Sequence, residues 1–280
     1  MIHSIENGRF RISVDTRGAE LRRFTDLTDG HEYLWEGDPA IWSGTSPFLF
    51  PIVGRLRNDT YTLYGKEYRM PIHGFARNAE FALESASDTE LVFLLTESKE
   101  TLAQYPFAFA LRVRYAFAEN GFVMEFSVEN KNDTAMYFSL GAHPAFAISL
   151  GDRVVMDEEE TLCAYKLNAD HLLDPTPHPV FDHSRTLTVT EQTFADDALI
   201  FFGMRSKGAS VIRTNGRSVH VTFDAPCLGL WAKPGAPYVC IEPWFGADDP
   251  HDADGDLTQK PYIVSLDANT TFVFPLCITV

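Results

Sequence analysis

The sequence predicts an all-β protein, a large antiparallel β-sandwich with few short helices. Three observations lead to this fold class: runs of alternating apolar and polar residues recur along the chain, Asn-Gly pairs separate several of them, and helical periodicity is nearly absent. Strands that are regularly spaced and joined by tight turns bury their apolar faces by stacking two sheets. The sheets should be large, because the chain has 280 residues.

Hairpins are the clearest local elements of the chain. An Asn-Gly pair between two alternating runs favours the tight turn of a β-hairpin, because both residues tolerate a positive φ. Asn120-Gly121 and Asn215-Gly216 stand in such positions. We expect hairpins over residues 61–70, 111–129 and 209–223, and further strands over residues 10–14, 91–95, 187–190 and 271–276.

One stretch of the chain predicts a helix. Residues 99–105 follow Ser98, whose hydroxyl suits an N-cap, and they precede Pro106, which cannot continue a helix. Elsewhere proline and glycine are scattered and never gather into a linker, and no repeat or low-complexity tract is present. We therefore expect a single domain over residues 1–280.

The composition excludes several classes of partner. The formal net charge is −16 and the pI is about 4.9, so the chain lacks the basic surface on which nucleic-acid binding depends. No apolar run approaches the ~18 residues of a membrane helix, and the N-terminus has no signal-peptide pattern. The four cysteines are far apart and form no CxxC pair. We expect a cytoplasmic protein with reduced thiols, as a monomer or homodimer.

Four segments carry polar side chains among apolar ones, next to glycine and proline. His73 and His143 lie in two of them, and Glu242 follows an apolar run typical of a buried strand. A buried Glu either pairs with a cation, here Arg55 or Arg57, or has a pKa raised toward neutrality, which a general base needs. For each histidine, the alternative is a core side chain bonded to the backbone. The segments span residues 50–59, 71–77, 139–146 and 239–246.

Other chemistries lack their sequence signatures. No HxH or HExxH pair is present, so we expect no metal. The GxSxG, GxGxxG and P-loop patterns are absent too, so we expect no cofactor. Residues 248–256 form an acidic loop that looks somewhat like a calcium site but lacks the alternation and the closing Glu of an EF-hand. We expect solvated surface there.

Taken together, six segments resemble the aldose 1-epimerase superfamily and are most similar to its bacterial branch sometimes called LacX-like. They occur in order and span most of the chain: residues 48–56, 73–77, 105–107, 141–146, 197–201 and 228–246. Six motifs in register are specific for the superfamily, though not for the substrate. The resemblance implies a large antiparallel β-sandwich known as a supersandwich, in agreement with the strand pattern.

The resemblance also implies an activity and the residues that perform it. Glu242 matches the family's general base, His143 its general acid, and His73 the second histidine, which holds the sugar and its ring oxygen. The implied reaction is that of an aldose 1-epimerase, or mutarotase, which opens and recloses the sugar ring so that α and β anomers interconvert. We expect burial to raise the pKa of Glu242, and nearby carboxylates to hold His143 protonated.

Two substrate-binding positions follow from the same resemblance. Arg55 resembles the family's sugar-binding arginine, with Arg57 as its alternative. Asp197 resembles the aspartate that binds sugar hydroxyls, with Asp196 as its alternative. We prefer Asp197, because an apolar strand-like run follows it directly.

Three further functions fit the same scaffold. A hexose-6-phosphate 1-epimerase would hold its phosphate with arginines such as Arg57 and Arg77. A non-catalytic carbohydrate-binding protein would keep the aromatic residues and an arginine, but it would not need both His143 and Glu242. A lyase or hydrolase on the same sandwich is the third, because a fold does not fix the chemistry.

Overall fold

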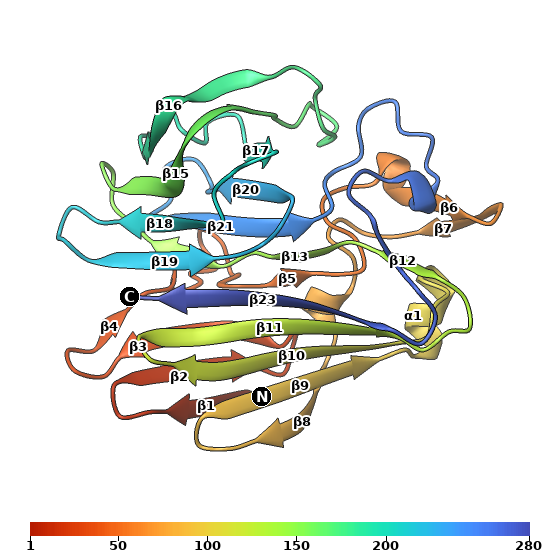
Figure 1. Ribbon diagram of the computed structural model, residues 1–280, viewed down its shortest axis with the longest axis horizontal. Coiled ribbons are helices and arrows are strands. Elements are labelled where there is room, and N and C mark those ends of the chain that lie inside the picture. The colour runs from red at the N-terminus through yellow and green to blue at the C-terminus, as the bar shows by residue number, and fades with distance from the viewer.

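The computed structural model describes residues 1–280, and the chain is built almost wholly from antiparallel strands (Figure 1). Its largest sheet has nine strands, with the C-terminal strand near the middle (Figure 1). From one edge to the other, these strands are β16 (His178–Thr188), β15 (Arg153–Ala164), β18 (Gly208–Ile212), β19 (Ser218–Thr222), β23 (Thr271–Thr279), β11 (Gly121–Asn130), β10 (Phe109–Ala118), β9 (Glu90–Thr96) and β8 (Ala82–Ala86).

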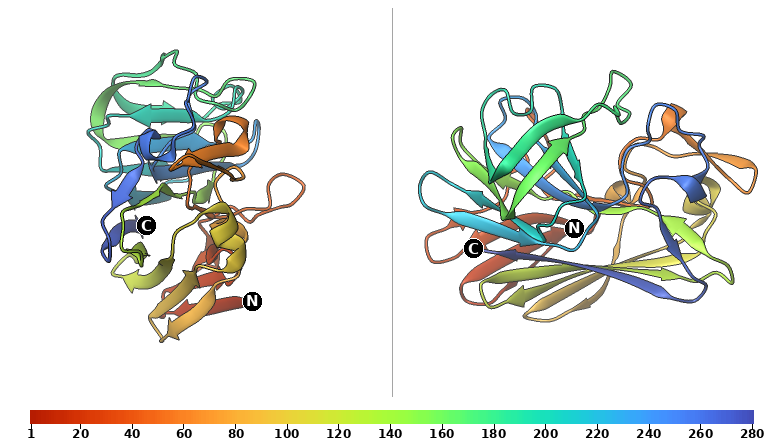
Figure 2. Two further views of the ribbon diagram at one scale, coloured as in Figure 1. Left: turned by 90° about the vertical axis from the view of Figure 1, so that its right-hand side faces the viewer. Right: turned by 45° about the horizontal axis from the view of Figure 1, so that its top comes forward.

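Two smaller sheets form the second layer of the sandwich, which Figure 2 shows from the side. The N-terminal sheet consists of β1 (Ile2–Glu6), β2 (Phe10–Asp15), β3 (Glu20–Asp26) and β4 (His31–Glu32). The other sheet is ordered β17 (Leu199–Phe202), β20 (Cys227–Trp231), β21 (Tyr238–Phe245), β13 (Leu140–Ala142) and β5 (Phe48–Leu49), and β14 (Ala145–Ala147) also pairs with β21. We call this second one the central sheet.

Short elements complete the fold. Two-stranded ribbons pair β6 (Thr60–Leu63) with β7 (Lys66–Arg69) and β12 (Met136–Phe138) with β22 (Val264–Leu266). The helical turns are α1 (Lys99–Gln104), η1 (Arg57–Asp59), η2 (Ala76–Asn78) and η3 (Leu257–Gln259). The predicted class, a large antiparallel β-sandwich with few short helices, is therefore confirmed.

The predicted hairpins and helix form as their turn and cap residues indicate. The hairpin over residues 111–129 is β10 paired with β11, and the two others are β18 with β19 and β6 with β7. The Ser98 hydroxyl accepts a hydrogen bond from the amide of Thr101, whose own hydroxyl accepts one from the amide of Ser98. This reciprocal cap satisfies two amide groups that the first turn of α1 leaves free.

Aromatic side chains join the layers. Strand β11 alternates buried and partly exposed residues, so one of its faces is apolar along its whole length. From that face the Phe122 ring meets Phe24 of β3 at 4.9 Å, and Phe126 meets Phe48 of β5 at 5.3 Å. Toward the other edge of the nine-stranded sheet, Phe181 meets Phe201 of β17 at 5.6 Å. The central sheet is thereby fixed against the larger one, and its strands hold the candidate site.

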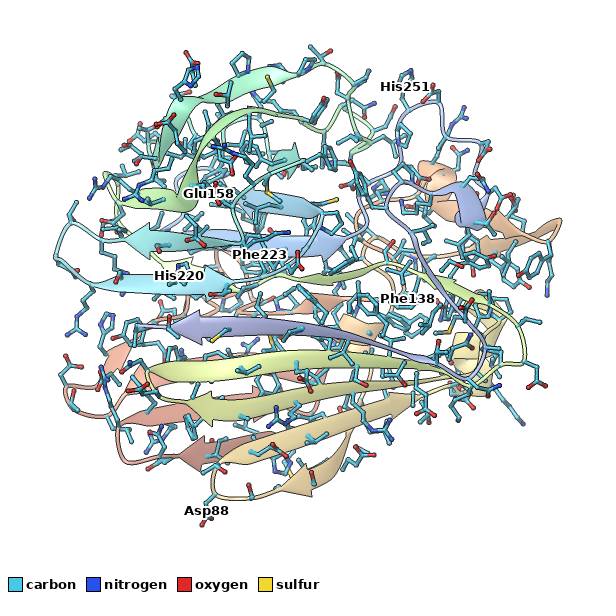
Figure 3. All side chains as sticks on the ribbon, viewed as in Figure 1. Asp88, Phe138, Glu158, His220, Phe223 and His251 are labelled. Atoms are coloured by element: carbon cyan, nitrogen blue, oxygen red, sulfur yellow. The ribbon has the colours of Figure 1, made fainter.

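Surface and interior follow the usual division of polarity. Phe138 and Phe223 are buried, whereas Asp88 and His251 project from opposite ends of the molecule (Figure 3). The four cysteines are free thiols, two of them buried. None of the helices has the length and apolar character needed to span a membrane.

Candidate active site

A cavity of about 230 Å³ opens beside the central sheet and collects most of the predicted site residues. Its polar lining comes from segments that are far apart in the sequence, and three tryptophans supply much of its apolar wall. The polar residues that matter below are His73, Arg77, His143, Asp197, Glu242 and Asp248, and the aromatic ones are Trp42, Trp231 and Trp244.

Glu242 enters the cavity from a strand that is buried almost from end to end. Alternation along β21 puts Cys240, Glu242 and Trp244 on one face of the sheet. Opposite Glu242 on β20 stands Gly229, where a side chain would collide with the Trp244 ring at 2.6 Å. The carboxyl group is only 2% exposed. Burial, followed by the charge of Asp248, raises the pKa of Glu242 well above its usual range, as the sequence predicted.

His143 lies directly after β13 and reaches the same point of the cavity. Its backbone amide donates to the Pro47 carbonyl at 3.0 Å, and its Nε2 lies 3.4 Å from Oε2 of Glu242. Burial lowers the pKa of His143 to about 3, so the expectation that nearby carboxylates hold the imidazole protonated is wrong. Removal from water disfavours the charged form of both groups, which favours a carboxylic acid beside a neutral imidazole.

His73 is held by the backbone of the segment that precedes it in the cavity wall. Its Nδ1 accepts a hydrogen bond from the Gly54 amide at 3.1 Å, and its own amide donates to the Gly54 carbonyl at 2.9 Å. Because Nδ1 accepts, the neutral ring carries its proton on Nε2 and can donate from there. Burial lowers the pKa of His73 well below its usual range. Its φ of 64°, rare for a residue with a side chain, is imposed by this tight exchange with Gly54.

Of the two aspartates considered from the sequence, Asp197 lines the cavity. Its Oδ1 accepts from the Ala198 amide at 2.9 Å, and its Oδ2 lies 3.6 Å from Nδ1 of His171. Asp196 points to solvent, with a side chain 74% exposed, and pairs with Lys166 at 2.8 Å. The sequence assigned no role to His171, since its polar surroundings gave no signal.

Arg55, which the resemblance implies as the sugar-binding arginine, does not line the cavity that holds Glu242 and His143. Its Nη1 pairs with Oδ1 of Asp59 at 2.8 Å, and its side chain lines a neighbouring cavity instead. The reason is local: the turn of η1, with positive φ at Asn58 and Asp59, brings the carboxylate of Asp59 alongside. Arg57, the alternative, is exposed and donates to the Ala253 carbonyl. Arg77 lines the main cavity in their stead and forms no ion pair.

Asp248 is a buried carboxylate in the cavity wall that sequence reasoning missed. Its Oδ1 accepts from the Arg55 amide at 2.7 Å, and burial raises its pKa to about 6. Its carboxyl group packs on Gly54, where an added Cβ would stand 2.3 Å away. Asp249 beside it is also buried and pairs with Lys260, so the prediction of a wholly solvated acidic loop is wrong for these first two residues.

Comparison with known proteins assigns the chain to a family. The model of the family described as aldose 1-epimerase matches residues 1–261. The chain belongs to the aldose 1-epimerase family. The plasmid-encoded protein LacX of Lactococcus lactis subsp. lactis is 30% identical over 285 residues, which cover 95% of each chain.

Solved structures similar to this member of the aldose 1-epimerase family have the same fold. A galactose mutarotase related enzyme from Lactobacillus acidophilus has a TM-score of 0.94 at 34% identity, covering 100% of this chain and 97% of its own. A galactose mutarotase-like protein from Lactobacillus casei has a TM-score of 0.95 at 26% identity, with coverages of 100% and 99%. Family membership makes the chain an isomerase-type carbohydrate enzyme.

One set of metal-ligating side chains lies within this site. Ligand atoms of His143, Cys240 and Glu242 all fall within 4.8 Å of one another. In a tetrahedral zinc site, bonds near 2.0–2.3 Å hold the ligand atoms roughly 3.3–3.8 Å apart. Burial also raises the pKa of the Cys240 thiol well above its usual range. We therefore assign these residues of the aldose 1-epimerase no metal.

Proposed function

We propose that the protein is an aldose 1-epimerase that interconverts the α and β anomers of an aldose, with Glu242 and His143 as the proton-transferring pair. One observation carries the proposal: the carboxyl group and the imidazole lie 3.4 Å apart, both buried, in the wall of one cavity. The hydroxyl and ring oxygens of a hemiacetal share the anomeric carbon. A compact pair of groups can therefore serve both oxygens at once.

Ring opening moves two protons in opposite directions. Glu242, as carboxylate, takes the proton of the C1 hydroxyl, the bond from C1 to the ring oxygen breaks, and protonated His143 gives its proton to that oxygen. The aldehyde turns about the C1–C2 bond. Closure on its other face returns both protons and gives the other anomer, so no redox partner is needed.

Glu242 and His143 together carry the one proton that this cycle needs. Transfer of one proton from Glu242 to His143, whose Oε2 and Nε2 lie 3.4 Å apart, changes no net charge and gives the carboxylate and imidazolium with which ring opening begins. Ring opening ends with a carboxylic acid and a neutral imidazole, which is the state that burial favours. The surroundings of the pair therefore stabilise the protonation state in which the open-chain aldehyde is formed.

The remaining lining residues supply binding. The proton on Nε2 of His73 makes it a donor to a sugar oxygen, and Asp197 offers acceptor oxygens to sugar hydroxyls. We assign the substrate-binding arginine to Arg77 rather than Arg55, because only Arg77 lines this cavity. The four unpaired thiols support a reducing, cytoplasmic setting, and the large core cluster of 65 buried residues supports one domain. Monomer or homodimer stays a prediction.

The proposal is tested by exchange NMR on common aldoses at anomeric equilibrium. The wild-type protein should transfer magnetisation between α and β signals, and Glu242→Gln should abolish this transfer while circular dichroism and the melting temperature stay near wild-type values. The exposed Glu191→Gln is the matched control and should exchange normally. Full activity of Glu242→Gln would remove the proposed base, and an inert wild type on all sugars would leave a carbohydrate-binding protein.

A hexose-6-phosphate 1-epimerase is the second candidate, and Arg77 favours it. Its guanidinium forms no ion pair, and it lines both the main cavity and an adjoining one of about 400 Å³ that also contains Arg17 and Arg22. A phosphate would neutralise such a group. If the substrate is a sugar phosphate, Arg77→Met should lower kcat/KM for the 6-phosphate by at least tenfold more than for the parent sugar (about 1.4 kcal/mol).

A further inference from the structure

The imidazole of His143 lacks the hydrogen bond that ordinarily orients a catalytic histidine. When one ring nitrogen transfers protons, the other usually bonds to a carboxylate or carbonyl, and that bond fixes the ring. Here Nε2 faces Glu242, while Nδ1 is buried without a partner. Rotation of the ring about its bond to Cβ is therefore not restrained by a hydrogen bond from Nδ1 to another residue.

The indole of Trp42 lies against the imidazole of His143 and can orient it instead. The Trp42 ring stacks on the imidazole, with centroids 5.1 Å apart and planes inclined by 27°. The ring of Trp231 meets the same imidazole edge-on at 5.6 Å. A stacked plane resists rotation of the ring beneath it, since any large turn would drive imidazole edge atoms into the indole face.

Trp42 is itself held firmly by the loop between β4 and β5. Its carbonyl accepts a hydrogen bond from the indole of Trp35 at 2.8 Å, and its amide donates to the Asp38 carbonyl at 2.8 Å. Gly44 lies against the indole, where an added Cβ would come within 2.5 Å of it. Thr45, one residue further, is anchored by the Glu20 carboxylate. The loop therefore presents the indole in one pose.

We propose that Trp42 is a positioning residue: its indole fixes the plane of the His143 imidazole in place of the missing hydrogen bond at Nδ1, so that Nε2 is aimed at Glu242 and at the sugar oxygens. This inference rests on the proposed function for its kinetic consequence. Its structural part, the restraint of one ring by another, holds whether or not any sugar reacts. A misplacement near 1 Å at a reacting group lowers rates by about 100-fold, so loss of the stack should act on kcat.

The test combines kinetics with NMR of the His143 ring. Trp42→Leu should lower kcat for anomer exchange by about 10- to 100-fold, with KM changed less than about threefold. Trp42→Phe, which restores a stacking plane, should keep kcat within about threefold of wild type. Ser43→Ala, at the exposed next position of the loop, is the control and should behave as wild type. Circular dichroism identifies any variant that fails to fold, and the phenylalanine variant then decides.

The NMR measurement separates this inference from the proposed function. In the wild type, the ring protons of His143 should show the upfield shifts of a stacked imidazole and a single conformation. In Trp42→Leu these shifts should vanish and relaxation should report exchange between ring orientations. An unchanged, rigid ring in Trp42→Leu, or a loss confined to KM, would overturn the positioning role. A wild type that exchanges no sugar would defeat the proposed function while the ring measurement still decides the role of Trp42.

Discussion

Nε2 of His143 and Oε2 of Glu242 lie 3.4 Å apart, although the two residues are 99 positions apart in the chain. The contact exists because β13 and β21 are neighbours in the central sheet, with Gly141 opposite Trp244. His143→Asn removes the proton carrier but keeps a small polar side chain. We expect kcat for anomer exchange to fall by about 10²–10⁴-fold, as for loss of a general acid–base catalyst. His220→Asn, on the far β19, should exchange normally and serves as the control in the same NMR assay.

The same contact predicts an unusual dependence on pH. The pair works with one shared proton. A second proton is taken up only in strong acid, because burial lowers the pKa of His143 to about 3, and burial raises the pKa of Glu242 well above its usual range. In Asp248→Asn, which removes the cavity-wall carboxyl group whose pKa is about 6, we expect kcat/KM to show no acid limb above about pH 5. An acid limb centred near the ordinary histidine value of about 6.5 would contradict a neutral resting pair.

Local signals in the sequence predict the hairpins better than the outer strands. Asn120-Gly121 fixes the turn between β10 and β11, so pattern and turn agree. The long pair β15 and β16 was hard to predict from the sequence. Register shifts interrupt its pairing between Val155 and Glu160, and three successive acidic residues of β15 face solvent. The predicted strand 187–190 is only the end of β16, which stops at Thr188. Bulged, exposed edge strands lack the strict alternation on which such predictions depend.

The residues of the candidate site also differ in how well the sequence could identify them. His73, His143 and Glu242 could be found because polar residues in apolar, glycine-containing strands are unusual. Arg77 and Asp248 could not be ranked above Arg55 by such reasoning. Their places depend on loop geometry, above all on the backbone exchange between Gly54 and His73, which only the folded chain creates. Trp42 was missed for the same reason, since its loop reaches His143 through contacts distant in sequence.

Replacement of Asp248 by asparagine should stabilise the protein at neutral pH. The folded-state pKa of about 6 lies above the ordinary 3.8, so the folded protein binds this proton more tightly than the unfolded chain does. The resulting advantage is fully present below pH 4 and is lost as the pH rises through 6. At pH 7.5 the buried charge should cost on the order of 1–3 kcal/mol. Asp248→Asn avoids this charge and keeps an oxygen for the Arg55 amide.

The measurement for Asp248→Asn is urea unfolding at several pH values. The free energy of unfolding should exceed that of the wild type at pH 7.5, and the difference should shrink toward zero near pH 4. Asp252→Asn, an exposed change in the same loop, should leave the free energy of unfolding unchanged at both pH values. A variant less stable than wild type at pH 7.5 would mean that the carboxylate is paired more strongly than its contacts indicate.

Lys260 is a buried cation paired with Asp249, the chain neighbour of the cavity-lining Asp248. Its Nζ lies 2.5 Å from Oδ1 of Asp249, with side chains 2% and 5% exposed. The other oxygen of Asp249 accepts from the Arg57 amide at 3.0 Å, so the pair joins the loop after β21 to the turn after Gly54. Lys260→Met removes the cation but leaves the carboxylate buried. We expect the free energy of unfolding to fall by about 3–5 kcal/mol, since an unpaired buried charge is strongly destabilising.

A double variant shows whether that loss comes from the stranded charge. Lys260→Met combined with Asp249→Asn leaves no charge to strand, and the amide oxygen can still accept from Arg57. The double variant should therefore recover most of the stability that Lys260→Met loses, so the losses of the two single variants should be far from additive. Additive losses would instead assign the effect to packing of the lysine stem. Because Asp248 adjoins this pair, the single variant should also widen the cavity and raise KM, whereas the double variant should restore KM.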